Sequence, residues 1–373
     1  MVVLAIETSC DDTCVAIIEA DRPRRRTPGS LRGRRRYQRG FGRIKILSNI
    51  ISSQVKLHAK YGGVYPFLAK REHQKNLPIV LKKALKKAKS ASRRAKIDLI
   101  AVTVGPGLEP CLWVGVNFAK DLAKKLNLPI IPVNHIEAHI LANWLTLDIA
   151  RPTANKIFPA ICLIVSGGHT QLILAKDFGK YKILGETRDD AAGECFDKVA
   201  RILGLSYPGG PAIEKEASKL PATSYQLQIK LPRPMIYQKN YDFSFSGLKT
   251  AVLYNYRSQK PRVRKSKKYI QAMSAETQRA IIDVLIHKTI KAAKEYKAKA
   301  IILGGGVTAN KELRRQFKVK IRKELPDINY LLPDTKLCTD NALMIAVAAY
   351  YHWLKEKGKG WKKIKADANL RIG

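Results

Sequence analysis

The chain has 373 residues, 46% of them hydrophobic, which is enough apolar material for two α/β domains or lobes. Its 69 basic residues against 30 acidic ones give a net charge of +39. Such a charge favours a polyanionic partner, with nucleic acid as the first candidate. No apolar run reaches the roughly 18 residues that span a bilayer, and the apolar start leaves no room for a cleavable leader, so we expect a cytoplasmic protein. The six scattered cysteines indicate reduced core thiols rather than a disulfide scaffold.

The first half of the chain predicts a β-hairpin followed by alternating helices and strands. Residues 2–20 contain two β-rich runs around the polar turn at 9–13. The basic stretch 21–43 follows neither the helical nor the strand period and is treated as an insertion. Further along we expect a helix at 78–91 with Pro78 in its first turn, a buried strand at 99–104 and a helix at 114–126.

The second half repeats this plan, because residues 158–174 form a second hairpin pattern around the turn at 166–170. Two such hairpins predict an internally duplicated α/β architecture. The remaining expectations are a helix at 191–203 capped by Asp189 and Asp190, a chain break at 207–211, a loop at 258–268, a helix at 275–296, a strand at 299–303, and a helix at 342–353 capped by Asp340 and Asn341.

Three turns have the composition that holds phosphates. Residues 6–13, 165–170 and 303–310 combine glycine or small polar residues with the ends of apolar runs. Backbone N–H groups in such turns can bind an anion, and strand ends collect ligands in α/β folds. A plain hairpin turn explains any single one of them equally well.

His135 and His139 are four residues apart where a helix is expected to begin, so both imidazoles project from one face and can share a metal ion. Asp340 is our choice for a third ligand, although a capping role alone explains it equally well. Two histidines and one carboxylate suit Fe(II) or Zn(II), with iron slightly favoured. A zinc protease is disfavoured because Glu137 lies two residues after His135 and points away from the metal.

The insertion 21–43 has a composition suited to RNA. It is rich in arginine, punctuated by glycine, and carries two aromatic residues. We predict that it contacts RNA through Arg24, Arg25, Arg26, Arg34, Arg35 and Arg36.

Taken in order, these segments resemble the TsaD family, the bacterial branch of the tRNA adenosine threonylcarbamoyltransferases. The matching segments run from end to end of the chain and are 6–13, 61–64, 105–108, 134–139, 165–171, 189–198, 207–211, 243–250, 304–310 and 338–341. The resemblance implies an actin-like, sugar-kinase-like (ASKHA) α/β fold of two duplicated lobes with the active site in the cleft between them. It also implies transfer of threonylcarbamoyl from threonylcarbamoyl-AMP to N6 of adenosine 37 in tRNAs reading codons that begin with A, with release of AMP.

The resemblance also assigns residues. It implies His135, His139 and Asp340 as ligands of one divalent metal ion, Fe(II) ahead of Zn(II). It places Ser9, Asp11 and Asp12 near the reacting group as catalytic residues. The adenylate is implied to lie on Ile164, Val165, Ser166, Gly167, Gly168, Asp197, Gly210, Glu214 and Asn310. Relatives act with TsaB-like and TsaE-like proteins, so we expect both as partners beside tRNA. The resemblance also makes tRNA the RNA that the six arginines of the insertion 21–43 are expected to contact.

Four departures from the family pattern stand out. Ile164 replaces a tyrosine of archaeal relatives, Asp12 replaces the usual glutamate, Phe67 also replaces a glutamate, and Pro110-Cys111 replace Gly-Ser. We expect an N-terminal lobe at 1–131 completed by the helix at 340–356, a C-terminal lobe at 132–339 with the metal and adenylate sites, and a basic tail at 357–373. Two alternative functions stay open, a non-catalytic scaffold of the same fold and an ATPase or kinase of the same fold.

Overall fold

The computed structural model describes residues 1–21, 44–92, 96–145, 154–219, 229–356, 358 and 360–373. The chain divides into two compact units. Unit 1 consists of Met1–Gln54, Tyr65–Ile157 and Asp340–Ile372, and unit 2 consists of Val55–Val64, Phe158–Thr339 and Gly373. Among the described residues, no helix is both long and apolar enough to cross a membrane.

Unit 1 is built on a five-stranded sheet in the order β3-β2-β1-β4-β5. Its strands are β1 (Val2–Glu7), β2 (Asp12–Ala20), β3 (Ile44–Ser53), β4 (Leu99–Gly105) and β5 (Ile130–Asn134). β1, β2 and β3 form an antiparallel meander, whereas β4 and β5 run parallel to β1. The expected first hairpin and buried strand are therefore confirmed.

The two faces of this sheet bury different helices. Val2, Leu4 and Ile6 share a hydrophobic core with apolar side chains of α2 (Pro66–Ala91) and α3 (Glu109–Leu126). Side chains alternate along a strand, so Val3, Ala5 and Glu7 point to the opposite face. α12 (Ala342–Lys355) packs against β1 and β2 and also against α4 (His135–Leu141).

Unit 2 repeats the topology of unit 1. Its sheet has the order β10-β9-β6-β7-β8, with β6 (Ala160–Val165), β7 (Thr170–Asp177) and β8 (Lys180–Glu186) antiparallel, and β9 (Ala300–Gly304) and β10 (Asn329–Leu331) parallel to β6. The order and directions match those of unit 1 when β6 is aligned with β1. This match confirms the predicted duplication.

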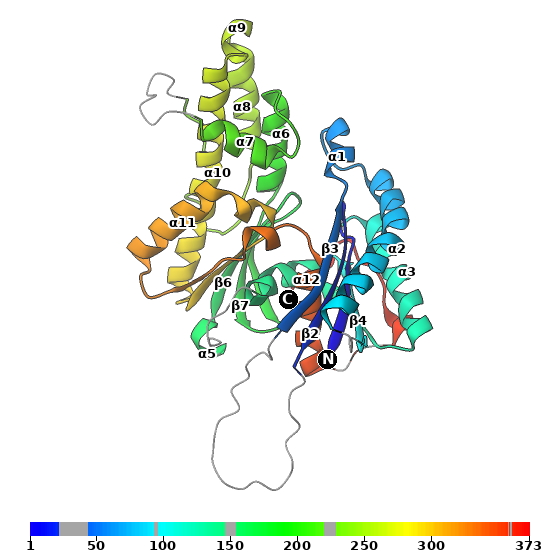
Figure 1. Ribbon diagram of the computed structural model, residues 1–373. Coiled ribbons are helices and arrows are strands. Elements are labelled where there is room, and N and C mark those ends of the chain that lie inside the picture. The colour runs from blue at the N-terminus through cyan, green and yellow to red at the C-terminus, as the bar shows by residue number, and fades with distance from the viewer. Residues whose placement is uncertain (22–43, 93–95, 146–153, 220–228, 357, 359) are drawn as a thin grey trace. The chain divides into compact units, whose positions relative to one another are not determined.

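Helices of unit 2 share its hydrophobic core. The core joins alternate residues of β6 to side chains of α6 (Ala192–Ile202), α7 (Gly209–Ala217), α8 (Ser246–Ser258), α10 (Lys267–Glu295) and α11 (Lys311–Glu324). A short helix, α9 (Pro261–Arg264), joins α8 to α10 (Figure 1). The shorter helices α1 (Val55–His58) and α5 (Ala154–Ile157) complete the α-helices of the described residues.

Several predictions about elements were wrong. Pro78 lies inside α2 and not in its first turn. A proline there removes one backbone hydrogen bond at a cost of about 3 kcal/mol, but buried side chains on both sides of it, from Ala69 to Ala88, hold the helix on the sheet. The glycines at 209 and 210 begin α7 instead of breaking the chain, and residues 258–268 contain α9 and the start of α10.

The division into units differs from the expected boundary after residue 131. Residues 132–145 lie in unit 1, because β5 adds to the first sheet and α4 follows it directly. The metal-ligand candidates therefore belong to unit 1, while the candidate adenylate residues belong to unit 2. The residues of α12 also lie in unit 1.

Candidate metal centre and substrate turns

α4 presents its two histidines directly after β5. Asn134 caps the helix, since its Oδ1 accepts hydrogen bonds from the backbone N–H groups of Ile136 (2.9 Å) and Glu137 (3.2 Å). All seven residues of α4 are buried. The cap fixes where the helix starts and thereby places His135 and His139 on one face.

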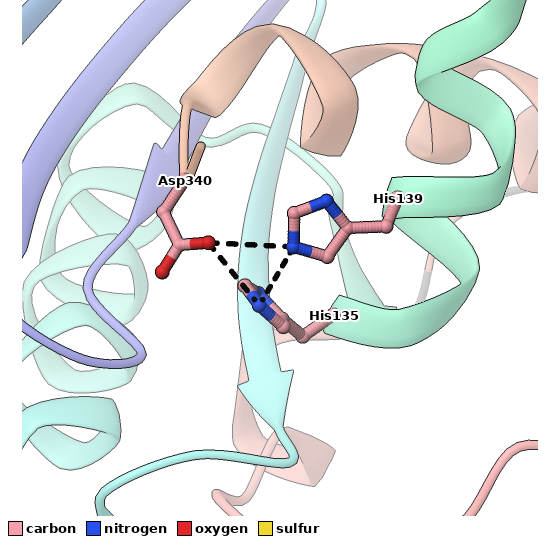
Figure 2. A group of neighbouring side chains, drawn as sticks. All are labelled: His135, His139 and Asp340. Carbon is pink, nitrogen blue, oxygen red and sulfur yellow. Dashed lines mark hydrogen bonds and ion pairs between the residues drawn. The ribbon is translucent and has the colours of Figure 1, made fainter. Parts of the chain in front are cut away.

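Asp340 completes the group from the residue before the cap of α12 (Figure 2). The Nε2 atoms of His135 and His139 are 3.2 Å apart, and Asp340 Oδ1 lies 3.5 Å from the first and 3.3 Å from the second. Ligand atoms about 2.1 Å from one ion are about 3.0 to 3.4 Å apart at octahedral or tetrahedral angles. The three side chains therefore fit a single metal ion with little adjustment.

Glu7 lies behind His135 and was missing from the predicted site. Its Oε2 is 3.1 Å from His135 Nδ1 and accepts a hydrogen bond from the Thr103 hydroxyl at 2.6 Å. A carboxylate on Nδ1 orients an imidazole so that Nε2 faces a metal. The sequence feature that could have identified Glu7 is a glutamate at the end of an otherwise apolar strand. Alternation along the strand places its side chain on the α4 face of the sheet.

The charges of the group are coupled. Burial acts to lower the pKa of His135, but the carboxylates of Asp340 and Glu7 outweigh it and raise this pKa to about 9. Burial acts to raise the pKa of Glu7, but His135 holds it below its usual value. Burial lowers the pKa of His139. Near neutral pH and without metal, the His135 imidazole is therefore protonated and the His139 imidazole is neutral.

The turn between β1 and β2 brings the expected catalytic residues to this group. Ser9 Oγ lies 3.2 Å from His135 Nδ1. Burial raises the pKa of Asp12 to about 7, and the buried Asp12 Oδ1 has no hydrogen-bond partner within the part of the chain that the structure describes. Asp11 lies beside Asp12 and adds to its raised pKa.

His73 of α2 holds this turn, and no sequence signal pointed to it. Its Nε2 bonds to the backbone oxygen of Cys10 at 2.9 Å, so the ring donates there. Its Nδ1 lies 2.7 Å from the Thr13 hydroxyl, which then donates to the ring. A fully buried histidine thus connects both ends of the turn to a helix.

In unit 2, the candidate adenylate residues start at the turn between β6 and β7. Ser166 N donates to His169 O at 2.8 Å, and His169 N donates to Ser166 Oγ at 3.1 Å. Gly167 and Gly168 are exposed, whereas Ile164 and Val165 are fully buried in β6. Position 193 of α6 has to be glycine, because a Cβ there would lie 2.5 Å from Ser166 O.

The side chains of three other candidate adenylate residues hold the starts of α7 and α11. Asp197 Oδ1 accepts from Gly209 N at 2.6 Å, and Glu214 Oε1 accepts from Lys311 N at 2.7 Å. Asn310 caps α11 through Leu313 N at 2.9 Å. A Cβ on Gly210 would meet open space. These side chains connect α6, α7 and α11 to one another.

Other expectations have mixed outcomes. Asn341 caps α12 through Met344 N at 3.2 Å as predicted. Asp189 and Asp190 do not cap α6; Asp189 accepts from the backbone N–H of Phe245 at 2.8 Å, and Asp190 pairs with Lys198 at 2.6 Å. All six cysteines are free. The six arginines predicted to contact tRNA lie outside the described residues.

Glu137 points away from the metal group, as predicted. Its Oε2 lies 2.7 Å from His352 Nε2 on α12. Glu137 is therefore not placed to act as the base of a zinc protease.

Fold and site together define a class, an ASKHA-type α/β protein with a histidine, histidine and carboxylate group. Two solved structures of HypF show the same fold at 13% identity. The full-length protein in its phosphate- and nucleotide-bound form gives a TM-score of 0.55, covering 96% of this chain and 56% of that one. HypF of T. kodakarensis gives 0.56, covering 95% and 47%.

The chain belongs to the TsaD family of tRNA N6-adenosine threonylcarbamoyltransferases, whose model matches residues 45–347. This confirms the family that the motifs resemble. The enzyme of that name from Thermosipho melanesiensis is 47% identical over 94% of both chains. The enzyme from Thermosipho africanus is 45% identical over the full length of both chains. The enzyme from Geobacillus kaustophilus is 43% identical over 93% of this chain and 90% of that one. The family is one of transferases.

Proposed function

We propose that this chain transfers the threonylcarbamoyl group from threonylcarbamoyl-AMP to N6 of adenosine 37 in tRNAs that read codons beginning with A. The adenosine amine attacks the carbamoyl carbonyl carbon, the bond from that carbon to the phosphate oxygen breaks, and AMP leaves with the electron pair. The attacking nitrogen loses one proton. Family membership supports the reaction, and the geometry of His135, His139 and Asp340 is the observation that carries it.

The proposed cofactor is one divalent metal ion, Fe(II) ahead of Zn(II), held by these three side chains. A bound ion supplies a Lewis acid that orients the threonylcarbamoyl end and polarises its carbonyl. Glu7 would hold the His135 ring in place. Two imidazoles and one carboxylate leave positions open for a substrate.

Asp12 is our candidate for the proton acceptor. A pKa of about 7 suits a base at neutral pH, and a buried carboxylate oxygen without a partner can accept a proton from a bound amine. Ser9 and Asp11 would position the reacting group from the same turn. In unit 2, the turn at 164–168 would bind the adenylate through the backbone N–H groups of Gly167 and Gly168, with Asp197, Gly210, Glu214 and Asn310 around it.

The proposed partners are tRNA, a TsaB-like protein and a TsaE-like protein, and the proposed compartment is the cytoplasm. Family membership supports the tRNA substrate. The net charge of +39 supports a polyanionic one.

The test is synthesis of the modified nucleoside from threonylcarbamoyl-AMP and tRNA, measured by mass spectrometry with and without the two partner proteins. We expect His135→Ala to lower kcat/KM at least about 100-fold, because loss of a ligand exceeds the 10- to 100-fold effect of losing an outer partner. His287→Ala on α10 of unit 2 is the control and should keep the parental rate.

Unchanged product in His135→Ala would contradict the metal's part in the reaction. No product from the parent with both partners present would favour the scaffold. Release of phosphate from ATP without tRNA would favour the ATPase or kinase.

A further inference from the structure

The far end of the α8–α9–α10 hairpin of unit 2 carries a concentrated positive charge. We call this surface the basic tip. It consists of six exposed cations, Arg257, Lys260, Arg262, Lys265, Lys267 and Lys268. The chain contains no aspartate or glutamate from residue 243 to residue 275. The charge of the tip is therefore not balanced from within its own segment.

The backbone of the basic tip is held in place by packing beneath it. Tyr269 is 1% exposed, and its hydroxyl donates to Asn255 Oδ1 at 2.8 Å. Ser266 caps α10 by accepting from Tyr269 N at 3.2 Å. The guanidinium carbon of Arg264 lies 5.2 Å from the centre of the Tyr256 ring. An ordered scaffold of this kind loses little conformational entropy when a ligand binds its cations.

An exposed aromatic ring adjoins these cations. Tyr254 is 66% exposed and lies three residues before Arg257 on α8, which puts both on the same side of the helix. Cations interleaved with exposed aromatic side chains are typical of surfaces that bind RNA, because phosphates pair with the charges and bases can stack on the rings.

The basic tip lies within RNA reach of the candidate adenylate residues. Gln278 of α10 accepts a hydrogen bond from Asn310 Nδ2 at 2.8 Å. Eleven residues separate Gln278 from Lys267, where α10 begins. At 1.5 Å per helical residue this is about 16 Å, a span that one tRNA arm can cover.

We infer that the basic tip binds the phosphate backbone of the substrate tRNA and so helps to position the adenosine that is modified. The inference rests on the proposed function for the identity of the RNA. It assigns this surface in addition to the insertion 21–43 and is independent of it.

The experiment compares two triple variants of the full chain. Arg262→Gln, Lys265→Gln and Lys267→Gln remove three charges from the basic tip. Lys318→Gln, Arg322→Gln and Lys323→Gln remove the same residue types from the exposed side of α11, also in unit 2. Binding of unmodified tRNA is measured by fluorescence anisotropy at several salt concentrations.

We expect the tip variant to bind tRNA at least about tenfold more weakly near 0.15 M salt. Its salt slope should fall by about 2 to 3, since each phosphate that the protein no longer neutralises lowers the slope by roughly 0.7 to 0.9. The α11 variant should stay within about twofold of the parent. Equal weakening of both variants, or none in the tip variant, would overturn the inference.

Hydrogen exchange on the parent gives a second measurement that needs no variant to fold. Protection of residues 257–268 on adding tRNA supports the inference, and unchanged exchange there overturns it. The outcomes also separate the two proposals. If the parent binds tRNA but forms no modified nucleoside, the proposed function fails and the binding data still decide the tip. If the parent modifies tRNA and the tip variant binds normally, only the tip inference fails.

Discussion

Glu7 stands on the strand face opposite the apolar core of unit 1, where the end of β1 meets α4 and α12. Its carboxylate contacts His135 Nδ1, the Thr103 hydroxyl and the backbone N–H of Ser9. One buried side chain thus connects the imidazole of a candidate metal ligand to the turn that carries Ser9, Asp11 and Asp12. The ring and the turn are positioned together because both bond to Glu7.

Removing the charge of Glu7 should weaken metal binding without unfolding the protein. Glu7→Gln keeps an oxygen that can accept a hydrogen bond from His135. It loses the negative charge that makes His135 Nε2 a better metal ligand. We expect the metal affinity to fall about 10- to 100-fold, measured by competition with a chromophoric chelator. Glu137→Gln on α4, which faces His352, is the matched control. Equal affinities for Glu7→Gln and the parent would contradict this role.

Metal affinity should also rise with pH. The pKa of His135 is about 9, so below that pH an incoming ion must displace a proton from a ligand. We expect the apparent affinity for Zn²⁺ to rise about tenfold per pH unit between pH 6.5 and 8.5, measured with the same chelator. In the metal-free protein the sign is opposite. Its protonated His135 stabilises the fold below pH 6.5, and that contribution is lost as pH rises through about 9. A flat affinity would show that His135 binds no ion.

At the scale of elements, close backbone contacts decide how α6 and α7, two helices that carry candidate adenylate residues, can pack. Gly209 and Gly210 both begin α7, but only Gly209 approaches another backbone. A Cβ on Gly209 would lie 2.5 Å from the Cα of Asp197, whereas one on Gly210 meets nothing within 4 Å. The adjacent glycines therefore have different functions, one in helix packing and the other at an open surface.

This difference predicts unequal stabilities for two similar variants. Gly209→Ala should lower the free energy of unfolding by about 1 to 3 kcal/mol, because the methyl group forces α6 and α7 apart. Gly210→Ala should stay within about 1 kcal/mol of the parent, since alanine suits a helix better than glycine. Urea denaturation measures both. Equal loss in the two variants would show that helix position and not packing sets the cost.

Helix starts give a related lesson about prediction. Asn341 caps α12 through its own side chain, so local chemistry was enough to predict it. Asp189 lies next to α6 in sequence, but its carboxylate bonds to the backbone and hydroxyl groups of Ser246 and to Ser244 and Phe245. A cap pattern predicts which residues can accept N–H groups, whereas the fold decides which donors are nearest.

On the scale of the whole molecule, the same strand order occurs twice, and each copy carries a different part of the proposed chemistry. Unit 1 holds the metal-ligand candidates and unit 2 holds the candidate adenylate turn and the basic tip. The chain as a whole has a net charge of +39. A protein that binds a highly charged RNA gains affinity from counterions released along the whole interface, so many weak ion pairs can act together.

The arginine-rich insertion 21–43 should contribute to the affinity for tRNA. Replacing residues 23–39 with a short Gly-Ser linker removes eight arginines. We expect weaker tRNA binding and a flatter salt dependence, with the slope lowered by roughly 0.7 to 0.9 for each phosphate that these arginines neutralise in the parent. Filter binding at several salt concentrations measures the slope. An unchanged slope would mean that these arginines serve another partner.

Much of the fold was already contained in local patterns. The two hairpins, the buried strand after residue 98, the histidine pair and the cap at Asn341 follow from periodicity and from residue chemistry, which act over a few neighbouring positions. The resemblance of the ordered motifs then indicated the family, which the match over residues 45–347 confirms.

Tertiary structure decided what depends on residues far apart in the chain. It placed Asp340 beside two histidines about 200 positions earlier, brought Glu7 and Thr103 behind them, used His73 to hold the first turn, and let α2 continue through Pro78. These contacts join separate elements, and their free energy comes from packing and burial that exist only once the sheet is assembled. A local pattern carries no record of those partners, so the sequence by itself predicted the strands and the candidate ligands, and the assembled fold determined their neighbours.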